Sequence, residues 1–171
     1  LRQVAALSHN KGYTLLCTNV ELIVGNQIPR WEDGASTISK VTDITNKLML
    51  TNPIVHSSVL MHTDTIRKIG GYATDRNMQL DYELWIRIAA AGGRVGLLHE
   101  TLVAKREHSY QSYGGRRRIR YLMSTAQLQI HAIKELSGNK ILFLMIFLRV
   151  LWGILPAPIR HKVRHLGRRK L

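Results

Sequence analysis

The sequence predicts an α/β fold. Its 171 residues are 45% hydrophobic and 21% charged, which is typical of a folded globular domain and excludes a disordered chain. Segments rich in β-branched and apolar residues alternate with segments of helical spacing as far as residue 105. Such alternation favours helices layered on a sheet. Only helical patterns follow residue 108, so an α-helical C-terminal extension is expected.

The elements are predicted in the following order. Residues 1–8 have apolar side chains at helical spacing, and residues 13–24 are predicted to form a strand that ends at the Gly25-Asn26 turn. Residues 28–37 are irregular, and residues 38–50 again approach helical spacing. The other expectations are a strand at 54–61, a helix at 64–69 closed by Gly70-Gly71, a polar loop at 73–79, a helix at 81–91, strands at 95–98 and 101–105, a linker at 110–115, a helix at 116–137 and apolar segments at 141–148 and 150–155.

The basic residues concentrate in the C-terminal third of the chain. Residues 1–108 contain 12 Lys and Arg against 10 Asp and Glu, whereas residues 109–171 contain 13 against one acid, Glu135. This asymmetry predicts an anionic partner for the C-terminal region. The single Cys17 cannot form an internal disulfide, and its apolar neighbours predict a buried thiol and a reducing compartment.

One carboxylate occupies a position suited to catalysis. In Leu80-Asp81-Tyr82-Glu83-Leu84-Trp85-Ile86-Arg87, Asp81 starts a predicted helix behind the glycines of Gly70-Gly71-Tyr72. Exposed N–H groups in the first turn of a helix stabilise negative charge, which favours an ionised side chain that can accept a proton. The alternative is that Asp81 only caps the helix, and the local features alone favour that alternative.

Four motifs in a fixed order favour a function for Asp81 beyond capping the helix. They are Asn52-Pro53-Ile54-Val55-His56-Ser57-Ser58-Val59, Ile69-Gly70-Gly71-Tyr72, Asp81-Tyr82-Glu83-Leu84-Trp85-Ile86-Arg87 and Lys105-Arg106-Glu107-His108. Over residues 1–112 this order resembles the second half of a family 2 glycosyltransferase with the GT-A fold. Two positions depart from the family pattern, because Leu80 replaces a Glu and Lys105 replaces a Tyr. Asp81 itself is retained.

The resemblance implies an inverting transfer of a sugar from a nucleotide-sugar donor to an acceptor hydroxyl, in polysaccharide or glycolipid synthesis. Asp81 would be the catalytic base, and a divalent metal, Mn²⁺ or Mg²⁺, would neutralise the leaving diphosphate. The Asp-x-Asp segment that holds the metal in this family is not found here. The metal ligands and the donor-binding half are therefore expected upstream of Leu1, and the fragment alone is expected to be inactive.

The resemblance also assigns roles to further residues. Substrate-binding roles fall to Gly70, Gly71, Tyr72, Tyr82, Trp85, His56 and Arg106, and a metal-binding role falls to His108. For the glycines the alternative is a plain helix C-cap. Core packing is favoured for Trp85, a hydrogen-bonded core position is favoured for His56, and an ordinary surface position is the alternative for Arg106 and His108. Arg87 is predicted to be a structural ion-pair partner.

The C-terminal region, residues 113–171, is predicted to be a separate unit after the catalytic residues 1–112. Residues 141–155 are apolar but short for a membrane span, and they contain Arg149. An in-plane or hairpin-like anchor fits better, with the basic side chains of residues 141–171 meeting anionic lipid on the cytoplasmic face of the plasma membrane. The alternative is that residues 141–155 pack on the catalytic domain and the tail is solvated. A lipid-linked or saccharide acceptor would suit such an anchor.

Two other functions compete with a glycosyltransferase. The pI of about 10.5 and the Arg116-Arg117-Arg118 cluster allow a nucleic-acid-binding module. Nucleic acid is disfavoured because aromatic residues suited to base stacking are sparse among these basic residues. The second alternative is a non-catalytic scaffold that kept the fold and lost activity, which the replacement at Leu80 makes possible.

Overall fold

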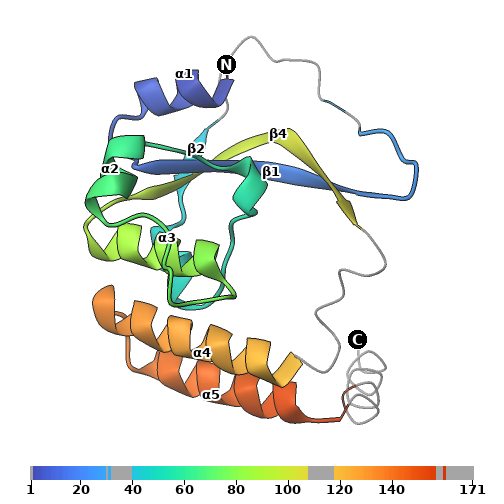
Figure 1. Ribbon diagram of the computed structural model, residues 1–171, viewed down its shortest axis with the longest axis vertical. Coiled ribbons are helices and arrows are strands. Elements are labelled where there is room, and N and C mark those ends of the chain that lie inside the picture. Colours follow the sequence, from blue (N-terminus) through green and yellow to red (C-terminus); the bar gives the residue numbers. More distant parts are fainter. Residues whose placement is uncertain (1, 30, 32–39, 108–117, 157–159, 161–171) are drawn as a thin grey trace.

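The computed structural model describes residues 2–29, 31, 40–107, 118–156 and 160, and it shows a mixed α/β fold (Figure 1). A four-stranded mixed sheet has the strand order β2-β4-β1-β3. The elements are α1 (Arg2–His9), β1 (Leu15–Val24), β2 (Val41–Asp43), the 3₁₀ helices η1 (Thr45–Met49) and η2 (His56–Ser58), β3 (Leu60–Met61), α2 (Thr63–Lys68), α3 (Leu80–Ala90), β4 (Val95–Glu107), α4 (Arg118–Glu135) and α5 (Ile141–Ile154). The predicted helices at 1–8, 64–69 and 81–91 and the strand at 13–24 are confirmed.

The parallel pair β1 and β4 forms the centre of the sheet. Alternate side chains of a strand point to opposite faces, and β1 follows this rule. Leu15 and Cys17 belong to the core on the α3 side, whereas Leu16 packs with Ala6 and Leu7 of α1 on the other face. The two short strands pair antiparallel to this centre, β2 with β4 and β3 with β1. Helices thus cover both faces of the sheet, as the alternating sequence pattern predicted.

The second halves of β1 and β4 continue as a two-stranded ribbon. The register shifts on either side of Asn19, which marks a β-bulge in the pair. Beyond it the side chains become more exposed towards the ends of both strands. Figure 1 shows the ribbon extending away from the helices. The core therefore lies under the first halves of the strands. The separate strands predicted at 95–98 and 101–105 are one continuous strand. Its pairing with β1 passes from Leu98 to Thr101 at the bulge without ending the strand.

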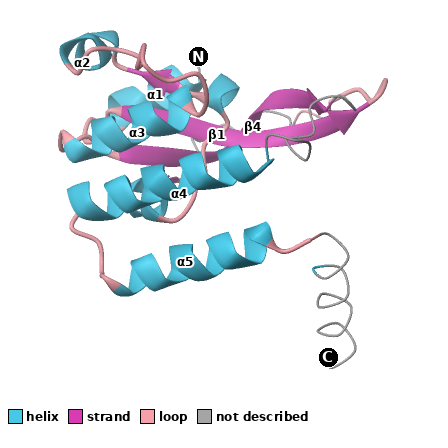
Figure 2. Cartoon of the chain, turned by 60° about the horizontal axis from the view of Figure 1, so that its bottom comes forward, coloured by secondary structure: helices cyan, strands magenta, loops and turns pink. Residues whose placement is uncertain are grey.

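The helices α3, α4 and α5 stack in succession below the sheet (Figure 1), and Figure 2 shows α5 on the far side of α4. Leu128 and Ala132 of α4 join the core that contains α3. Ile146 of α5 packs on Ala126 and Ile133 of α4. The helical pattern predicted for residues 116–137 is confirmed for the described part. The proposed domain boundary after residue 112 and the linker at 110–115 lie outside the described residues. None of the helices within the described ranges has both the length and the apolar character needed to cross a lipid bilayer.

The prediction of a helix over residues 38–50 is wrong for the described residues 40–50. This segment forms strand β2 and the short helix η1. Ile44 and Leu48 have helical spacing, and both enter the core, but hydrogen bonds to the sheet determine the backbone. The Ile44 N–H donates to the Val95 carbonyl at 2.9 Å, and the Thr45 hydroxyl oxygen accepts from the Val95 N–H at 2.9 Å.

The strand predicted at 54–61 is shorter than expected. Only Leu60 and Met61 pair with β1, and the preceding residues form the turn η2. The Ser58 hydroxyl donates to the Val55 carbonyl at 2.8 Å, and the Asn52 side-chain carbonyl accepts from the Ile54 N–H at 3.2 Å. Such local bonds from side chain to backbone compete with the ladder of a strand.

Cys17 provides a pH test of the core. Burial raises the pKa of its thiol from about 9 to about 11. Because the folded state holds the proton more tightly than the unfolded state, the stabilisation is complete below about pH 9 and is lost as the pH rises to about 11. We expect the free energy of unfolding to fall by on the order of 2 kcal/mol more in the wild type than in Cys17→Ala across this range. Urea denaturation at pH 8, 9.5 and 11 measures this, and equal losses in the two proteins would contradict it.

Candidate functional site

Asp81 lies in the first turn of α3 and is half-buried. Its Oδ1 accepts a hydrogen bond from the Tyr82 N–H at 2.8 Å, and its Oδ2 accepts one from the Asn52 side-chain amide at 3.3 Å. The first bond satisfies a backbone N–H at the helix start, which is what the capping alternative requires. A carboxylate has about four acceptor positions, so both bonds leave capacity to receive a proton.

The Gly70-Gly71 turn ends α2 and directs Tyr72 towards Asp81. Both glycines have positive φ, 87° and 66°, a conformation that other residues rarely adopt. The Gly71 N–H donates to the Ile66 carbonyl at 2.9 Å, which closes the helix in the manner of a C-cap. The C-cap alternative therefore describes the local geometry of the glycines. A role in the site remains only through Tyr72, whose position the turn sets.

The Glu83–Arg87 pair fastens this turn to α3. Arg87 Nε donates to Glu83 Oε1 at 2.6 Å, and its Nη2 donates to Glu83 Oε2 at 2.9 Å. The same guanidinium donates to the carbonyls of Ile69 at 2.6 Å and Gly71 at 2.5 Å. The prediction that Arg87 is a structural ion-pair partner is confirmed. The pair fixes the distance between the glycine turn and the helix that carries Asp81.

Tyr72 and His56 form the outer part of the cluster. His56 Nε2 and the Tyr72 hydroxyl lie 2.7 Å apart, and the His56 ring stacks on Trp85 with centroids 6.1 Å apart. Partial burial raises the pKa of Tyr72, and the negative charge of Asp81 raises it further. The phenol is therefore protonated at neutral pH and can donate to His56. We call Asp81, Asn52, Tyr72 and His56 the Asp81 cluster.

His56 differs from the sequence interpretation in its surroundings. A buried histidine on a strand was favoured, but His56 lies in the turn η2 and is exposed. The core interpretation is wrong because residues 56–58 form a turn before β3 begins at Leu60. The alternative, in which His56 lines the acceptor cleft, stays a prediction.

Tyr82 and Trp85 do not face the site. Their exposed fractions are 1% and 0%. The Tyr82 hydroxyl donates to the Leu48 carbonyl at 2.5 Å, and burial raises the pKa of this phenol. Core packing is confirmed for Trp85, and the substrate-binding role predicted for Tyr82 is wrong in this structure. Trp85 lies beneath the cluster, where the His56 ring stacks on it.

Arg106 lies on the exposed end of the β1–β4 ribbon. It donates a hydrogen bond to the Gly25 carbonyl, and among the described residues it has no contact with the Asp81 cluster. The surface alternative therefore accounts for Arg106. His108 lies outside the described residues. Within the described ranges, no group of three or more His, Cys, Asp or Glu side chains could hold a metal ion.

Sequence reasoning assigned no role to Asn52, although it begins the first motif of the resemblance. Its Nδ2 donates to Asp81 and its Oδ1 accepts from the Ile54 N–H, so one amide orients the carboxylate and shapes the following turn. The signal was present as an Asn followed by Pro53, a pair that favours a turn. The sequence could not show that this turn meets α3.

The Glu83–Arg87 pair is open to a direct test. In Arg87→Met we expect a loss of about 3 kcal/mol of stability, because Glu83 and two carbonyls lose charged hydrogen bonds in a partly buried site. The control Arg67→Met removes an exposed partner 3.8 Å from Asp64, and it should change stability by less than about 0.5 kcal/mol. Chemical denaturation measures both, and a small loss in Arg87→Met would show that the turn stands without the pair.

Comparison with known proteins adds no relative. No protein-family model, no curated protein and no solved structure matches this chain. The four ordered motifs, and the contacts between three of them, are therefore what any functional assignment rests on. The structure establishes a mixed α/β fold with a four-stranded mixed sheet and helices.

Proposed function

We propose that this chain is the acceptor-side half of an inverting glycosyltransferase of family 2 with the GT-A fold. The observation that carries the proposal is the meeting of three separate motifs in the Asp81 cluster. Asn52 and His56 come from the first motif, Tyr72 from the second and Asp81 from the third. Residues far apart in the sequence thus surround one half-buried carboxylate with groups that bind hydroxyls.

The cluster suits deprotonation of an acceptor hydroxyl. Asp81 takes the proton as the acceptor oxygen forms a bond to the anomeric carbon of the donor sugar. The bond from that carbon to the diphosphate breaks with its electron pair on the leaving oxygen, so a single displacement inverts the configuration. Asn52 holds the carboxylate in place, and the protonated Tyr72 with His56 offers hydrogen bonds to sugar hydroxyls.

A divalent metal belongs to the proposed activity, but the described residues do not fit one. Asp81 is the single carboxylate of the cluster, and it already accepts bonds from Asn52 and the Tyr82 N–H. Hard cations such as Mg²⁺ need several oxygen ligands. We therefore assign the metal and the donor diphosphate to segments beyond the described residues.

Asp81→Asn in the full-length protein tests the proposed base. We expect transfer to fall by about 10²- to 10⁴-fold with folding unchanged, because the amide cannot accept the acceptor proton. The matched control Asp64→Asn changes an exposed carboxylate on α2 and should retain wild-type turnover. Release of nucleoside diphosphate from nucleotide-sugars in the presence of acceptor measures the rate. Unchanged turnover in Asp81→Asn would remove Asp81 from the mechanism and favour the scaffold alternative.

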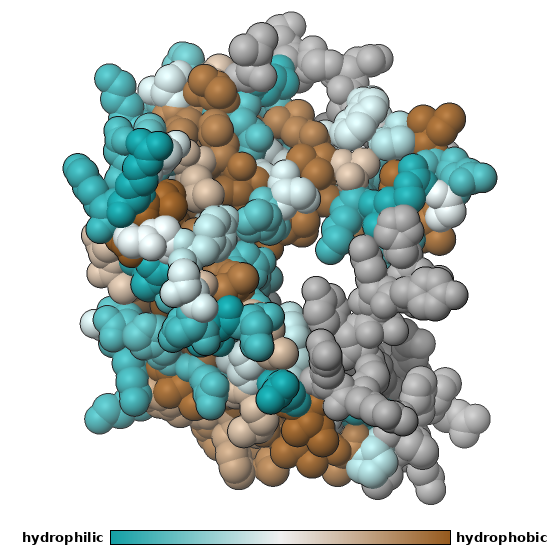
Figure 3. All heavy atoms as spheres, viewed as in Figure 1, coloured by the Kyte–Doolittle hydropathy of each residue, from teal (hydrophilic) through white to brown (hydrophobic). Residues whose placement is uncertain are grey.

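We further propose that α5 associates with an anionic membrane surface, on the cytoplasmic face of the plasma membrane. One side of the helix packs on α4, and the exposed Arg149 donates to the Leu50 carbonyl at 2.8 Å. The opposite side is apolar and exposed through Ile141, Leu144, Met145, Phe147, Leu148, Leu151 and Ile154. Figure 3 shows apolar side chains gathered at the lower edge of the molecule, over α5.

An apolar helix face beside a strongly basic sequence is typical of a helix that lies in the membrane interface. Anionic lipid explains both properties at once, because the acyl region accepts the apolar side chains and the headgroups attract Lys and Arg. The packing alternative accounts for the inner side of α5 only. A glycolipid acceptor would then reach the Asp81 cluster from the surface that α5 occupies.

Leu148→Glu tests the membrane face. We expect its partition onto phosphatidylcholine vesicles containing phosphatidylglycerol to fall about tenfold or more, because a charged side chain replaces an exposed leucine that would enter the membrane interface. Val4→Glu is the matched control, since Val4 is exposed to the same degree on α1, at 57% against 55%. Vesicle sedimentation measures both. Equal binding by Leu148→Glu and the wild type would show that α5 does not enter the interface.

A further inference from the structure

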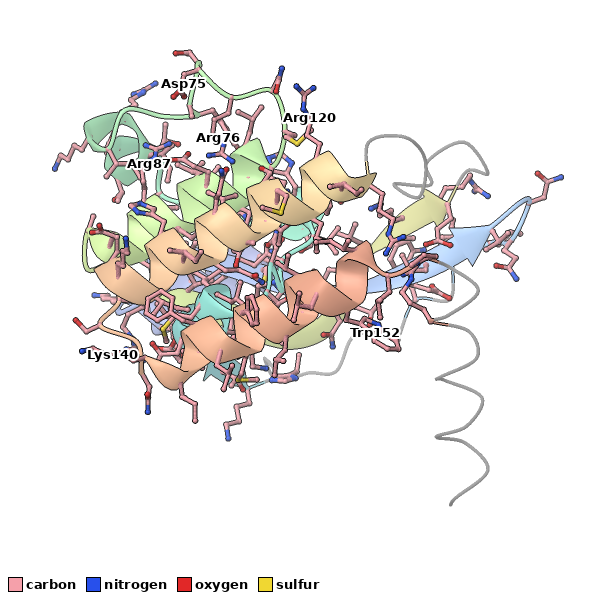
Figure 4. All side chains as sticks on the ribbon, turned by 90° about the horizontal axis from the view of Figure 1, so that it is seen from below. Asp75, Arg76, Arg87, Arg120, Lys140 and Trp152 are labelled. Atoms are coloured by element: carbon pink, nitrogen blue, oxygen red, sulfur yellow. The ribbon has the colours of Figure 1, made fainter. Side chains whose placement is uncertain are left out.

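A pocket outside the Asp81 cluster lies between the loop at residues 73–79 and α4. Its volume is about 360 Å³, and its lining residues are Asp75, Arg76, Asn77, Met78, Arg120, Met123, Ser124 and Gln127. Figure 4 shows Arg76 on the loop and Arg120 near the start of α4, on the same side of the molecule. The volume is at the small end of the range for ligand pockets, so it fits a compact polar group.

The two arginines of this pocket lack acidic partners within the described residues. Arg76 Nη2 donates to the Ser124 hydroxyl at 3.1 Å, while its Nε is buried without a hydrogen-bond partner. Neither Arg76 nor Arg120 forms an ion pair with Asp75 or with another described acid. A buried N–H without an acceptor is costly, and native proteins rarely leave one in this state. A bound acceptor group would remove that cost.

We propose that this pocket binds an oxyanion, a phosphate or a carboxylate. Guanidinium groups bind such planar or tetrahedral oxyanions with paired hydrogen bonds, and two arginines against one aspartate leave the pocket positive. Ser124 and Gln127 add neutral hydrogen-bonding groups on the α4 wall. Met78 and Met123 supply apolar contacts beside the anion.

The position of the pocket connects it with the Asp81 cluster. The loop at 73–79 leads directly into α3, and Gln79 fixes the end of this loop to α4 by donating to the Thr125 hydroxyl at 2.9 Å and to the Tyr121 carbonyl at 3.2 Å. An anion bound by Arg76 is therefore held at a set distance from Asp81. If the proposed glycosyltransferase function is correct, the oxyanion belongs to the acceptor, which is then a phosphate- or carboxylate-bearing saccharide or lipid.

Binding of inorganic phosphate to the full chain at low ionic strength tests the site without any donor sugar. We expect Arg76→Gln and Arg120→Gln each to weaken phosphate binding about tenfold or more, since each removes a charged donor. Arg67→Gln, on an exposed arginine of α2, is the matched control and should bind as the wild type does. Isothermal titration calorimetry gives the affinities, and circular dichroism checks the fold of each variant.

The phosphate-binding results distinguish failure of the anion site from failure of the proposed glycosyltransferase function. Phosphate binding that is equal in the wild type and both pocket variants, or weakened alike in the control, overturns the proposal. Because Arg120→Gln changes a residue that forms no described hydrogen bond, its result remains interpretable if Arg76→Gln fails to fold. Phosphate binding is measured without transfer, so unchanged turnover in Asp81→Asn would overturn the glycosyltransferase function and leave the anion site standing.

Competition identifies the source of the oxyanion. Displacement of inorganic phosphate by a soluble hexose phosphate supports a saccharide acceptor, and displacement by glucuronate supports a carboxylate-bearing one. Displacement only by phosphatidylcholine vesicles that contain phosphatidate supports a lipid phosphate. A failure of all three probes to displace phosphate from the wild-type protein would overturn the assignment of the pocket to an acceptor.

Discussion

The Glu83–Arg87 pair is the interaction on which the candidate site depends. Its guanidinium joins a carboxylate on α3 to the carbonyls of Ile69 and Gly71 at the end of α2. Charged hydrogen bonds of this kind are about twice as strong as neutral ones, and removing the arginine would leave Glu83 half-buried without compensation. Because Asp81 lies on the same helix, the pair also sets where Tyr72 stands relative to the carboxylate. The Glu83–Arg87 pair thus contributes both to the stability of the fold and to the geometry of the candidate site.

The sheet determines which end of α3 becomes the site. α3 ends shortly before β4 begins, and it packs along the sheet through Leu84 and Trp85. A helix in that position runs back along its strand, so its first turn lies towards the carboxyl ends of the parallel strands β1 and β4. Ligands of open α/β sheets bind at those ends. The location of Asp81 therefore agrees with a general property of the fold class.

Periodicity predicted the elements whose structure follows from the spacing of their apolar side chains. α1, α2, α3 and β1 follow from the apolar spacing and from Gly70-Gly71. The segments at 40–50 and 54–61 could not be predicted, because side-chain bonds from Thr45, Asn52 and Ser58 redirect the backbone. Burial of Tyr82 also escaped prediction. A surface helix buries one side, whereas α3 lies between the sheet and α4 and is buried on nearly all sides.

Helix α4 covers α3 and thereby helps to position the helix that carries Asp81. The buried Gln129 of α4 donates to the Leu50 carbonyl, and the neighbouring Tyr82 hydroxyl donates to that of Leu48, so η1 is held from both α3 and α4. The same helix forms one wall of the arginine pocket and anchors Gln79 at the start of α3. The charge asymmetry of the sequence suggested an appended anchor. In the structure, α4 instead packs on α3, the helix that carries Asp81, and α5 exposes an apolar face. A membrane surface bound by α5 would consequently lie one helix away from the pocket, because α5 packs on α4 and α4 packs on the helix that carries the proposed base.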